Sequence, residues 1–348
     1  MIKKTLKRIL QFGAAFSAVL VIGLVAVKSY GDANYFRHHD ATLPLNAEVG
    51  DNAVVTEPVN LFGVDMERNY RRIPFSIEAR PGDRVPCVLT QPIEVTEPLP
   101  TIIFVHGAGQ SKSFVERICS PFNASGFNMV SFDQWGQGER EHGGGALEAA
   151  RSWRERGWRS VHDTRRIVDY LLTRDDVDPE RLYLVGASYG SMVSTHVLAQ
   201  DKRFDAAILL VGGGDFRIMA DAPIFKEEIP APLRAVLKPA FVWVGKAFDP
   251  IYSAPHTGPT PILKQCGSAD RLVSPESGEA LFAALGEPKE LRWYDIDHPG
   301  LRQGDGPEII RLLDDGLVWL AAHAGIPMDS VHQAQQAPQA VMAATQEQ

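Results

Sequence analysis

Six short apolar runs, mostly separated by helix-length segments, constrain the fold of this 348-residue chain more than any other feature. The runs are TIIFV, NMVSF, RLYLV, AAILL, PILKQ and ELRWYDI, and segments such as VHDTRRIVDYLL and SGEALFAAL lie between them. Short runs of this kind are typical of parallel strands that are buried on both faces and joined by helical crossovers. The sequence therefore predicts an α/β fold with a mostly parallel central sheet and helices on both faces.

Other segments flank or interrupt this alternation. The runs YRRIPFSIEA and RVPCVLTQP flank a Pro-Gly-Asp turn and predict a β-hairpin ahead of the parallel strands. Between the fourth and fifth parallel runs, a proline-rich, apolar and partly helical insertion predicts a short lid. The expected organisation is a basic N-terminus with a membrane segment (1–27), a linker (28–60), the main domain (61–325, with the insertion at about 216–255) and a disordered, Gln- and Ala-rich tail (326–348).

The amino terminus has a basic flank followed by an uncharged apolar run. Four Lys and Arg residues within the first eight positions precede a run from residue 9 to residue 27, which is long enough to cross a bilayer. The run is longer than the core of a typical signal peptide, so an uncleaved single-pass anchor in the cytoplasmic membrane is favoured, with cleavage and secretion as the alternative. The basic flank should stay cytoplasmic, which places the main domain on the periplasmic or extracellular side.

Charge and cysteine content exclude several other classes of protein. The formal net charge of −8 leaves no extended basic surface, so nucleic acid is not an expected partner. The chain has no Cys-x-x-Cys pattern, and the His-His-Asp run at 38–40 stands in the linker without a second cluster, so no metal site is expected. The three cysteines lie in or beside apolar stretches and are expected to be buried small side chains: Cys87, Cys119 and Cys266.

The positions that follow the apolar runs carry candidate catalytic residues, because functional groups gather at the carboxyl ends of parallel strands. Ser188 stands between Gly186 and Gly190, the Gly-x-Ser-x-Gly spacing of a serine held exposed on a sharp strand-to-helix turn. A serine hydroxyl needs a neighbouring base to attack an ester at neutral pH, and that base needs a third group to orient it. Asp270 and His298 follow two later runs and complete the chain order serine, acid, histidine that accompanies this turn.

With these motifs, the chain from about Tyr70 to Gly325 resembles the α/β-hydrolase superfamily. The stretches FVHGAG, DQWGQGER, VDPERLYLVGASYGS and GSADRLVSP are similar to the dienelactone-hydrolase and acetyl-xylan-esterase-like branch, and also to the catalytic domain of prolyl-oligopeptidase-type enzymes. The resemblance implies the α/β-hydrolase fold and an oxyanion hole formed by the backbone N–H groups of Ala108 and Tyr189. Ser191 departs from the family pattern, which often has a further glycine at this point.

The leading interpretation is a carboxylesterase-like serine hydrolase that cleaves small-molecule or lipid-like esters through an acyl-serine intermediate, without a cofactor or metal. A serine peptidase, thioesterase, lactonase or acyltransferase would use the same intermediate, and these activities remain alternatives. A second class of interpretation is a hydrolase-fold protein that binds a ligand without catalysis. The insertion is expected to cover Ser188 and to set acyl-chain preference through apolar side chains such as Phe241 and Trp243.

Overall fold

The computed structural model describes residues 23–335, apart from residues 38, 142, 144 and 145. The chain divides into two compact units, Met1–His39 and Asp40–Gln348. In the first unit residues 23–33 are helical, and Lys28 forms an ion pair with Asp32 one turn further on. The larger part of the predicted membrane segment, residues 9–22, lies outside the described residues. Within those residues, no helix has both the length and the apolar character needed to span a membrane.

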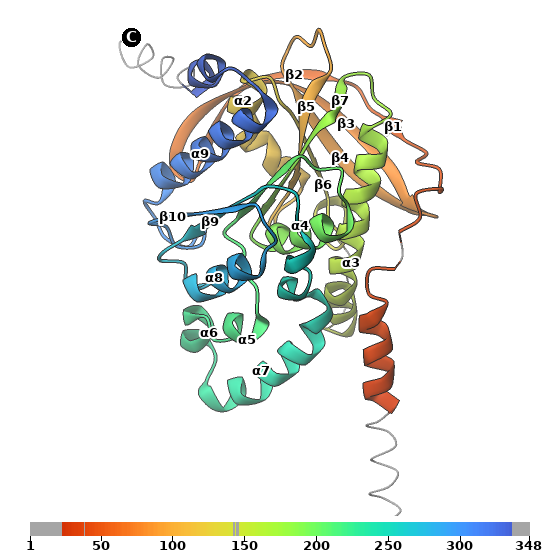
Figure 1. Ribbon diagram of the computed structural model, residues 1–348, viewed down its shortest axis with the longest axis vertical. Helices are drawn as coiled ribbons and strands as arrows, with labels where there is room; N and C mark the ends of the chain where they lie inside the picture. Colours follow the sequence, from red (N-terminus) through yellow and green to blue (C-terminus); the bar gives the residue numbers. More distant parts are fainter. Residues whose placement is uncertain (1–22, 38, 142, 144–145, 336–348) are drawn as a thin grey trace, which may run out of the picture. The chain divides into compact units, whose positions relative to one another are not determined.

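The second unit is built on one sheet, which has ten strands in the described part of the chain (Figure 1). The strand order is β1-β3-β4-β6-β5-β7-β8-β9-β10, and β2 pairs with β3. The six apolar runs of the sequence are β5 to β10 and pair in parallel, which confirms the predicted mostly parallel sheet. The strands are β1 (Glu48–Val49), β2 (Ala53–Leu61), β3 (Val64–Arg80), β4 (Asp83–Gln91), β5 (Leu99–Val105), β6 (Asn128–Phe132), β7 (Val177–Ala187), β8 (Ala206–Leu210), β9 (Ile262–Gly267) and β10 (Lys289–Tyr294).

Helices cover both faces of this sheet, as predicted (Figure 1). On one face lie α2 (Val115–Ala124) and α9 (Gly306–Ala324), and on the other lie α3 (Ala146–Leu171), α4 (Tyr189–Gln200) and α8 (Pro275–Ala284). The strands are apolar throughout because alternate residues point to opposite, equally covered faces. Along β7, for example, Tyr183 and Val185 join the cluster beneath α2 and α9, and the intervening Leu184 is fully buried as well.

The antiparallel edge of the sheet begins earlier in the chain than the sequence predicted. The predicted β3–β4 hairpin is present, with Arg80 paired to Asp83 across its turn. However, β1 and β2 lie largely within residues 28–60, which were assigned to a linker, and β2 pairs with β3 along its whole length. The assignment was wrong because most residues of β2 are exposed on both sides, so the strand lacks the apolar alternation that would have identified it.

The predicted disordered tail also needs correction. Residues 328–335 are helical, and Val331 and Ala334, three positions apart, are buried. Val331 belongs to the apolar cluster beneath α2 and α9. The short apolar stripe of this segment therefore extends the core beyond Gly325, which ends α9 in the left-handed conformation at φ 68°. Residues 336–348 lie outside the described part of the chain.

The insertion between β8 and β9 is helical, as expected. It contains α5 (Phe216–Met219), α6 (Pro223–Glu228) and α7 (Ala231–Gly245), followed by the short 3₁₀ turns η3 (Lys246–Phe248), η4 (Pro250–Tyr252) and η5 (Ala254–His256). Its two ends are tied together by Asp249, whose carboxylate accepts the backbone N–H groups of Asp215 at 3.0 Å and Phe216 at 2.8 Å. The insertion contacts α4 and α8, on the face of the sheet opposite α2 and α9 (Figure 1).

Candidate active site

Ser188 lies on a tight turn between β7 and α4, as its motif predicted. Its φ of 54° and ψ of −116° are strained for a residue with a side chain, which is typical of a nucleophile on a strand-to-helix elbow. A Cβ atom at Gly190 would lie 1.9 Å from the carbonyl oxygen of Val105, and one at Gly186 would lie 2.4 Å from the carbonyl oxygen of Gly190. The two glycines are therefore needed for α4 to begin directly against β5 and β7.

The structure brings Ser188, His298 and Asp270 into one hydrogen-bonded series. Ser188 Oγ lies 2.9 Å from His298 Nε2, and His298 Nδ1 lies 2.8 Å from Asp270 Oδ2. Because the carboxylate accepts, Nδ1 carries the proton and the lone pair of Nε2 faces the serine hydroxyl. The other oxygen of Asp270 accepts the backbone N–H groups of Leu272 at 2.9 Å and Val273 at 2.7 Å. This arrangement allows His298 to act as a general base toward Ser188.

Asp297 joins the two loops that carry the acid and the histidine, a role that its position after an apolar run did not predict. Its Oδ1 accepts the N–H of Arg271 at 2.9 Å and the N–H of His298 at 2.7 Å. Burial alone would raise the pKa of Asp297, but these N–H groups and the Arg271 guanidinium outweigh burial and lower it. Asp297 therefore stays ionised. Its carboxylate holds the backbone of His298 close to that of Arg271, the residue that follows Asp270.

The expected oxyanion donors lie beside Ser188. Tyr189 directly follows Ser188 and is the first residue of α4. On either side of Ala108, the backbone N–H groups are taken by glutamine side chains: Gln110 accepts from Gly107 at 3.0 Å, and Gln137 accepts from Gly109 at 2.5 Å. These two bonds fix the loop on both sides of Ala108, which lines the same cavity as Ser188.

The loop that carries Gln137 is in turn held by buried charges. Asp133 is fully buried and accepts the backbone N–H of Lys112 at 2.8 Å, the ammonium of Lys112 at 2.7 Å and the N–H of Glu139 at 3.1 Å. Asp133 follows β6, and its hydrogen bonds fix the turn between β6 and Arg140.

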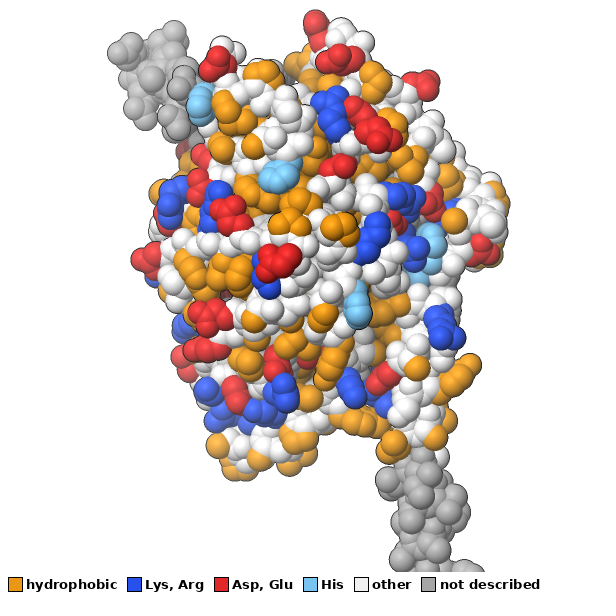
Figure 2. All heavy atoms as spheres, viewed as in Figure 1, with side chains coloured by type: hydrophobic (Ala, Val, Ile, Leu, Met, Phe, Trp, Pro, Cys, Tyr) orange, Lys and Arg blue, Asp and Glu red, His pale blue; other side chains and the backbone are white. Residues whose placement is uncertain are grey.

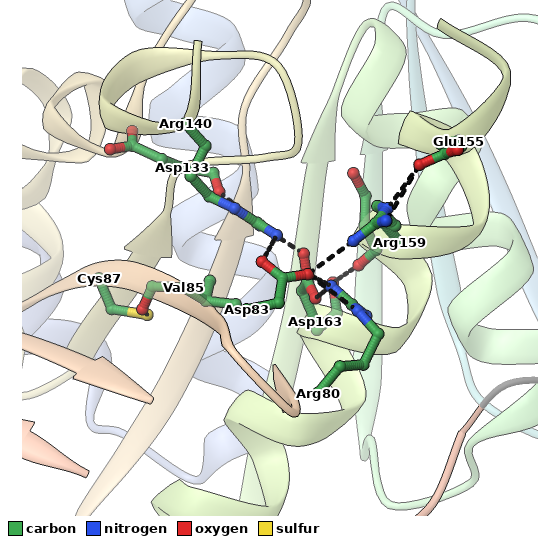
Figure 3. Close-up of polar contacts among 11 residues, drawn as sticks. Arg80, Asp83, Val85, Cys87, Asp133, Arg140, Glu155, Arg159 and Asp163 are labelled. Carbon is green, nitrogen blue, oxygen red and sulfur yellow. Dashed lines mark hydrogen bonds and ion pairs between the residues drawn. The ribbon is translucent and has the colours of Figure 1, made fainter. Parts of the chain in front are cut away.

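Figure 3 shows how Arg140, at the end of the same loop, enters an ion network. Arg140 donates to Asp163 at 2.6 Å and to Asp83 at 2.8 Å, and Arg80 donates to Asp163 at 2.7 Å. Burial alone would raise the pKa of Asp163, but Arg140 and Arg80 outweigh burial and lower it. The network joins the β3–β4 hairpin, α3 and the 133–140 loop, and so supports the oxyanion side of the site.

A cavity of about 140 Å³ opens beside Ser188 and His298, on the α2 and α9 side of the sheet. Its walls are mainly apolar, with side chains from strands β5 and β8, from both helices and from the β2–β3 turn. They include Phe62, Phe104, Phe114, Ile118, Leu210 and Leu313. Apolar cavities of this size, about 150 Å³, hold a molecule as large as benzene.

Phe62 is a wall residue that sequence reasoning missed. It forms the two-residue turn between β2 and β3 together with Gly63, and both residues have positive φ, 51° and 86°. This is the backbone of a type I′ hairpin turn. A Cβ at Gly306 would lie 2.3 Å from the carbonyl oxygen of Phe62, so the turn packs against the start of α9. The glycine of the Phe-Gly pair was the one local signal of this turn, because the run before it lacks the apolar alternation of a strand.

The expected lid is not found at this cavity, because none of the described residues that line it belongs to residues 216–255. Phe248 packs on Tyr189, with ring centroids 5.3 Å apart, so the insertion reaches the elbow from the opposite face of the sheet. Phe241 instead stacks on Phe216 within the insertion, at 5.1 Å, and Trp243 is 42% exposed. The prediction was wrong because apolar content does not tell which face of the sheet an insertion will cover.

Two further expectations from the sequence concern the cysteines and metal binding. The three cysteines are free and buried, as predicted. Burial raises the pKa of Cys119 to about 12. The described residues contain no group of three or more His, Cys, Asp or Glu side chains that could hold a metal ion.

Comparisons with known proteins agree with this architecture. Residues 96–244 match the family model described as serine aminopeptidase, S33. The chain is 29% identical over 206 residues to the uncharacterized protein YfhR of Salmonella typhi, and this match covers 57% of the chain and 64% of that protein, just under two thirds of its length.

Among solved structures, acetyl xylan esterase 1 of a Thermoanaerobacterium species aligns with a TM-score of 0.59 and 16% identity, covering 81% of this chain and 92% of that one. A puromycin-hydrolyzing peptidase of Mycobacterium tuberculosis aligns with a TM-score of 0.58 and 20% identity, covering 80% of this chain and 46% of that one. These structures share the fold that the motifs predicted. The chain therefore has the α/β-hydrolase fold.

Proposed function

We propose that this protein is a serine hydrolase that cleaves carboxylic esters of small molecules. The observation that carries the proposal is the hydrogen-bonded series from Ser188 Oγ through His298 to Asp270, with both contacts between 2.8 and 2.9 Å. A structural role does not require a serine at a strained φ of 54° beside an unprotonated imidazole nitrogen. Strain at such a position is typical of functional sites.

The residues supply each step of an acyl transfer. His298 Nε2 takes the proton of Ser188 as Oγ attacks the ester carbonyl carbon, and the N–H groups of Ala108 and Tyr189 stabilise the developing oxyanion. The tetrahedral intermediate then expels the alkoxide, which receives the proton from His298. In the second half, His298 deprotonates a water that attacks the acyl-serine, and the carboxylic acid leaves as Ser188 regains its proton. Loss of one oxyanion donor typically costs about 2.7–4 kcal/mol of transition-state stabilisation.

The cavity supports a small, apolar acyl group. Its volume of about 140 Å³ and its Phe and Leu walls suit a short aliphatic chain or a single ring beside the nucleophile. A long acyl chain would have to extend past Phe62 and the helices that close the far side. We therefore expect acetyl to butyryl esters to be better substrates than octanoyl esters.

A serine peptidase is the second candidate, because residues 96–244 match a serine aminopeptidase family model. An aminopeptidase must bind the charged amino group of its substrate, usually through a carboxylate. The described residues that line the cavity include no Asp or Glu. This favours esters over peptides with a free amino end. Thioesters would be cleaved through the same acyl-serine, as would acyl transfer to an alcohol.

We further propose that residues 9–27 hold the protein in the cytoplasmic membrane, with the hydrolase domain on the periplasmic or extracellular side. The apolar run and its basic flank support this proposal. A reporter that is active only outside the cytoplasm, fused after Gln348, should be active. Activity of a cytoplasmic reporter alone at that point would overturn it, and release of the domain from membranes would favour cleavage and secretion.

A matched substrate panel tests the proposed reaction. Hydrolysis of p-nitrophenyl acetate, butyrate and octanoate should be compared with that of alanine p-nitroanilide, which reports aminopeptidase activity. We expect ester hydrolysis that declines from butyrate to octanoate and little release of p-nitroaniline. Faster cleavage of the anilide than of any ester would overturn the proposal and identify the protein as a peptidase.

A further inference from the structure

Helix α7 presents an apolar stripe to solvent instead of to the core. Gly245 is its only buried residue, although most of the helix is apolar. The exposed large side chains recur at three- and four-residue intervals, which places them on one side of the helix. They are Leu233 (49% exposed), Val236 (69%), Leu237 (45%), Trp243 (42%) and Val244 (37%).

A hollow of about 610 Å³ continues this surface between α6 and α7. Apolar side chains line it, among them Phe225, Ile229 and Phe241, together with the basic Arg234 and Lys238. Figure 2 shows the result as a gathering of apolar side chains at the lower end of the view, where α6 and α7 lie, with Lys and Arg side chains beside it. A contiguous exposed apolar surface rimmed by polar residues is typical of an interaction site.

The charge around the stripe indicates which partner it suits. Within α7 and its immediate flanks, residues 229–248, the charged residues are Arg234, Lys238 and Lys246, and the acidic residues of this region lie outside that range, on and around α6. A second copy of the chain, packed symmetrically on the same surface, would bring these cations against one another. Lys238 lines the hollow beside the stripe and pairs with Asp221 at 2.5 Å.

An anionic lipid surface fits both the shape and the charge. Leu and Val side chains of an interfacial helix enter the acyl boundary, a Trp lies at the headgroup level, and Lys and Arg contact the phosphates. We propose that α7 and the adjoining hollow dock on an anionic lipid surface, with Leu233, Val236 and Trp243 inserted and the basic residues at the headgroups. This docking rests on residues 216–256 and does not depend on the proposed ester hydrolysis.

A site-specific environment probe on the full-length chain tests this docking. Because Cys87, Cys119 and Cys266 are all buried, a single introduced cysteine can be labelled with the polarity-sensitive fluorophore NBD. Val236→Cys reports the stripe, and Val54→Cys, where the native side chain is 57% exposed on β2, is the matched control. Both proteins keep the same amino terminus, so a difference between the two sites reports docking of α7.

We expect vesicles of phosphatidylcholine with phosphatidylglycerol to shift the NBD emission of Val236→Cys to the blue and to raise its intensity at least twofold. The Val54→Cys probe should not change. Adding Arg234→Gln and Lys238→Gln should reduce the shift and its sensitivity to salt. Neither residue lines the cavity beside Ser188, so hydrolysis of soluble p-nitrophenyl acetate should be unchanged.

Three results would overturn the proposal. One is the absence of any shift at position 236 with anionic vesicles. Another is an equal shift with phosphatidylcholine alone, which would remove the role of the basic residues. The third is a shift that grows with protein concentration without vesicles, which would identify a second copy as the occupant. Failure of ester hydrolysis alongside normal docking would count only against the proposed catalytic function.

Discussion

The cavity beside Ser188 and the surface of α7 are both built from Phe, Leu and Val side chains, but they differ in what stands behind them. The cavity walls belong to α2, α9 and the β2–β3 turn, which pack on the sheet and are part of the main core. No described side chain of α7 belongs to that core cluster, and many of its apolar side chains are more than a third exposed. The cavity is thus made by elements that also stabilise the fold, whereas the insertion can serve another surface.

The largest difference between the cavity beside Ser188 and the α7 surface should appear when the proposed base, His298, is removed. We expect His298→Ala to lower kcat for p-nitrophenyl butyrate by about 10⁴-fold or more, because the proton of Ser188 would have no acceptor. Arg234→Ala, on α7, should leave kcat within twofold. Stopped-flow or steady-state rates measure both. A loss of less than tenfold in His298→Ala would show that another group activates the nucleophile.

The ion network behind the cavity should be the next most sensitive point. Asp163→Asn leaves the buried Arg140 and Arg80 without their shared carboxylate and should lower the free energy of unfolding by about 3–5 kcal/mol. Glu308→Gln, which breaks a partly exposed pair with Arg311 on α9, should cost no more than about 1 kcal/mol. Urea titrations compare them. Equal, small losses would mean that the network does not hold the 133–140 loop.

His196 links α4 to the insertion, and it should make the free energy of unfolding depend on pH. Its Nδ1 lies 2.7 Å from Ser253 Oγ and its Nε2 lies 3.1 Å from the carbonyl oxygen of Phe248, and burial lowers its pKa from 6.5 to about 4. The unfolded chain therefore binds the proton more readily than the folded chain. The contribution of His196 to the free energy of unfolding is fully present above about pH 6.5. It falls by about 3 kcal/mol in total as the pH drops toward 4.

His196→Gln should remove this part of the pH dependence. The difference in unfolding free energy between wild type and variant, measured by denaturant titration at several pH values, should shrink between pH 6.5 and pH 4. Subtraction cancels the acid sensitivity of the carboxylates that both proteins share. A difference that stays constant over this range would show that His196 titrates normally in the folded state.

The smallest expected effects concern acyl preference. Phe62→Ala should enlarge the cavity and raise kcat/KM for octanoate relative to acetate by about tenfold, since one methylene in an apolar pocket is worth about 1–3 kcal/mol. Trp243→Ala should leave that ratio within twofold, because Trp243 lies in the insertion and is 42% exposed. The opposite pattern would restore the insertion as the lid that its sequence suggested.

These contrasts also show what the sequence could predict. Ser188, Asp270 and His298 were identifiable because each follows a recognisable strand, so local patterns and chain order were sufficient. Phe62 and Asp297 were not, because their roles depend on which elements pack against them. A type I′ turn reaches the pocket only once β2 has paired with β3, and Asp297 joins two loops 26 residues apart.

Covalent labelling tests the central claim, that Ser188 is an activated nucleophile, most directly. A fluorophosphonate reacts only with such a serine. The full-length protein, incubated with the probe and digested, should yield a single modified peptide that carries the adduct on Ser188. Ser191→Ala, which removes the fully buried neighbouring hydroxyl, should label like wild type, and Ser188→Ala should not label. Labelling of Ser188→Ala at the wild-type rate, or none in wild type, would contradict the account.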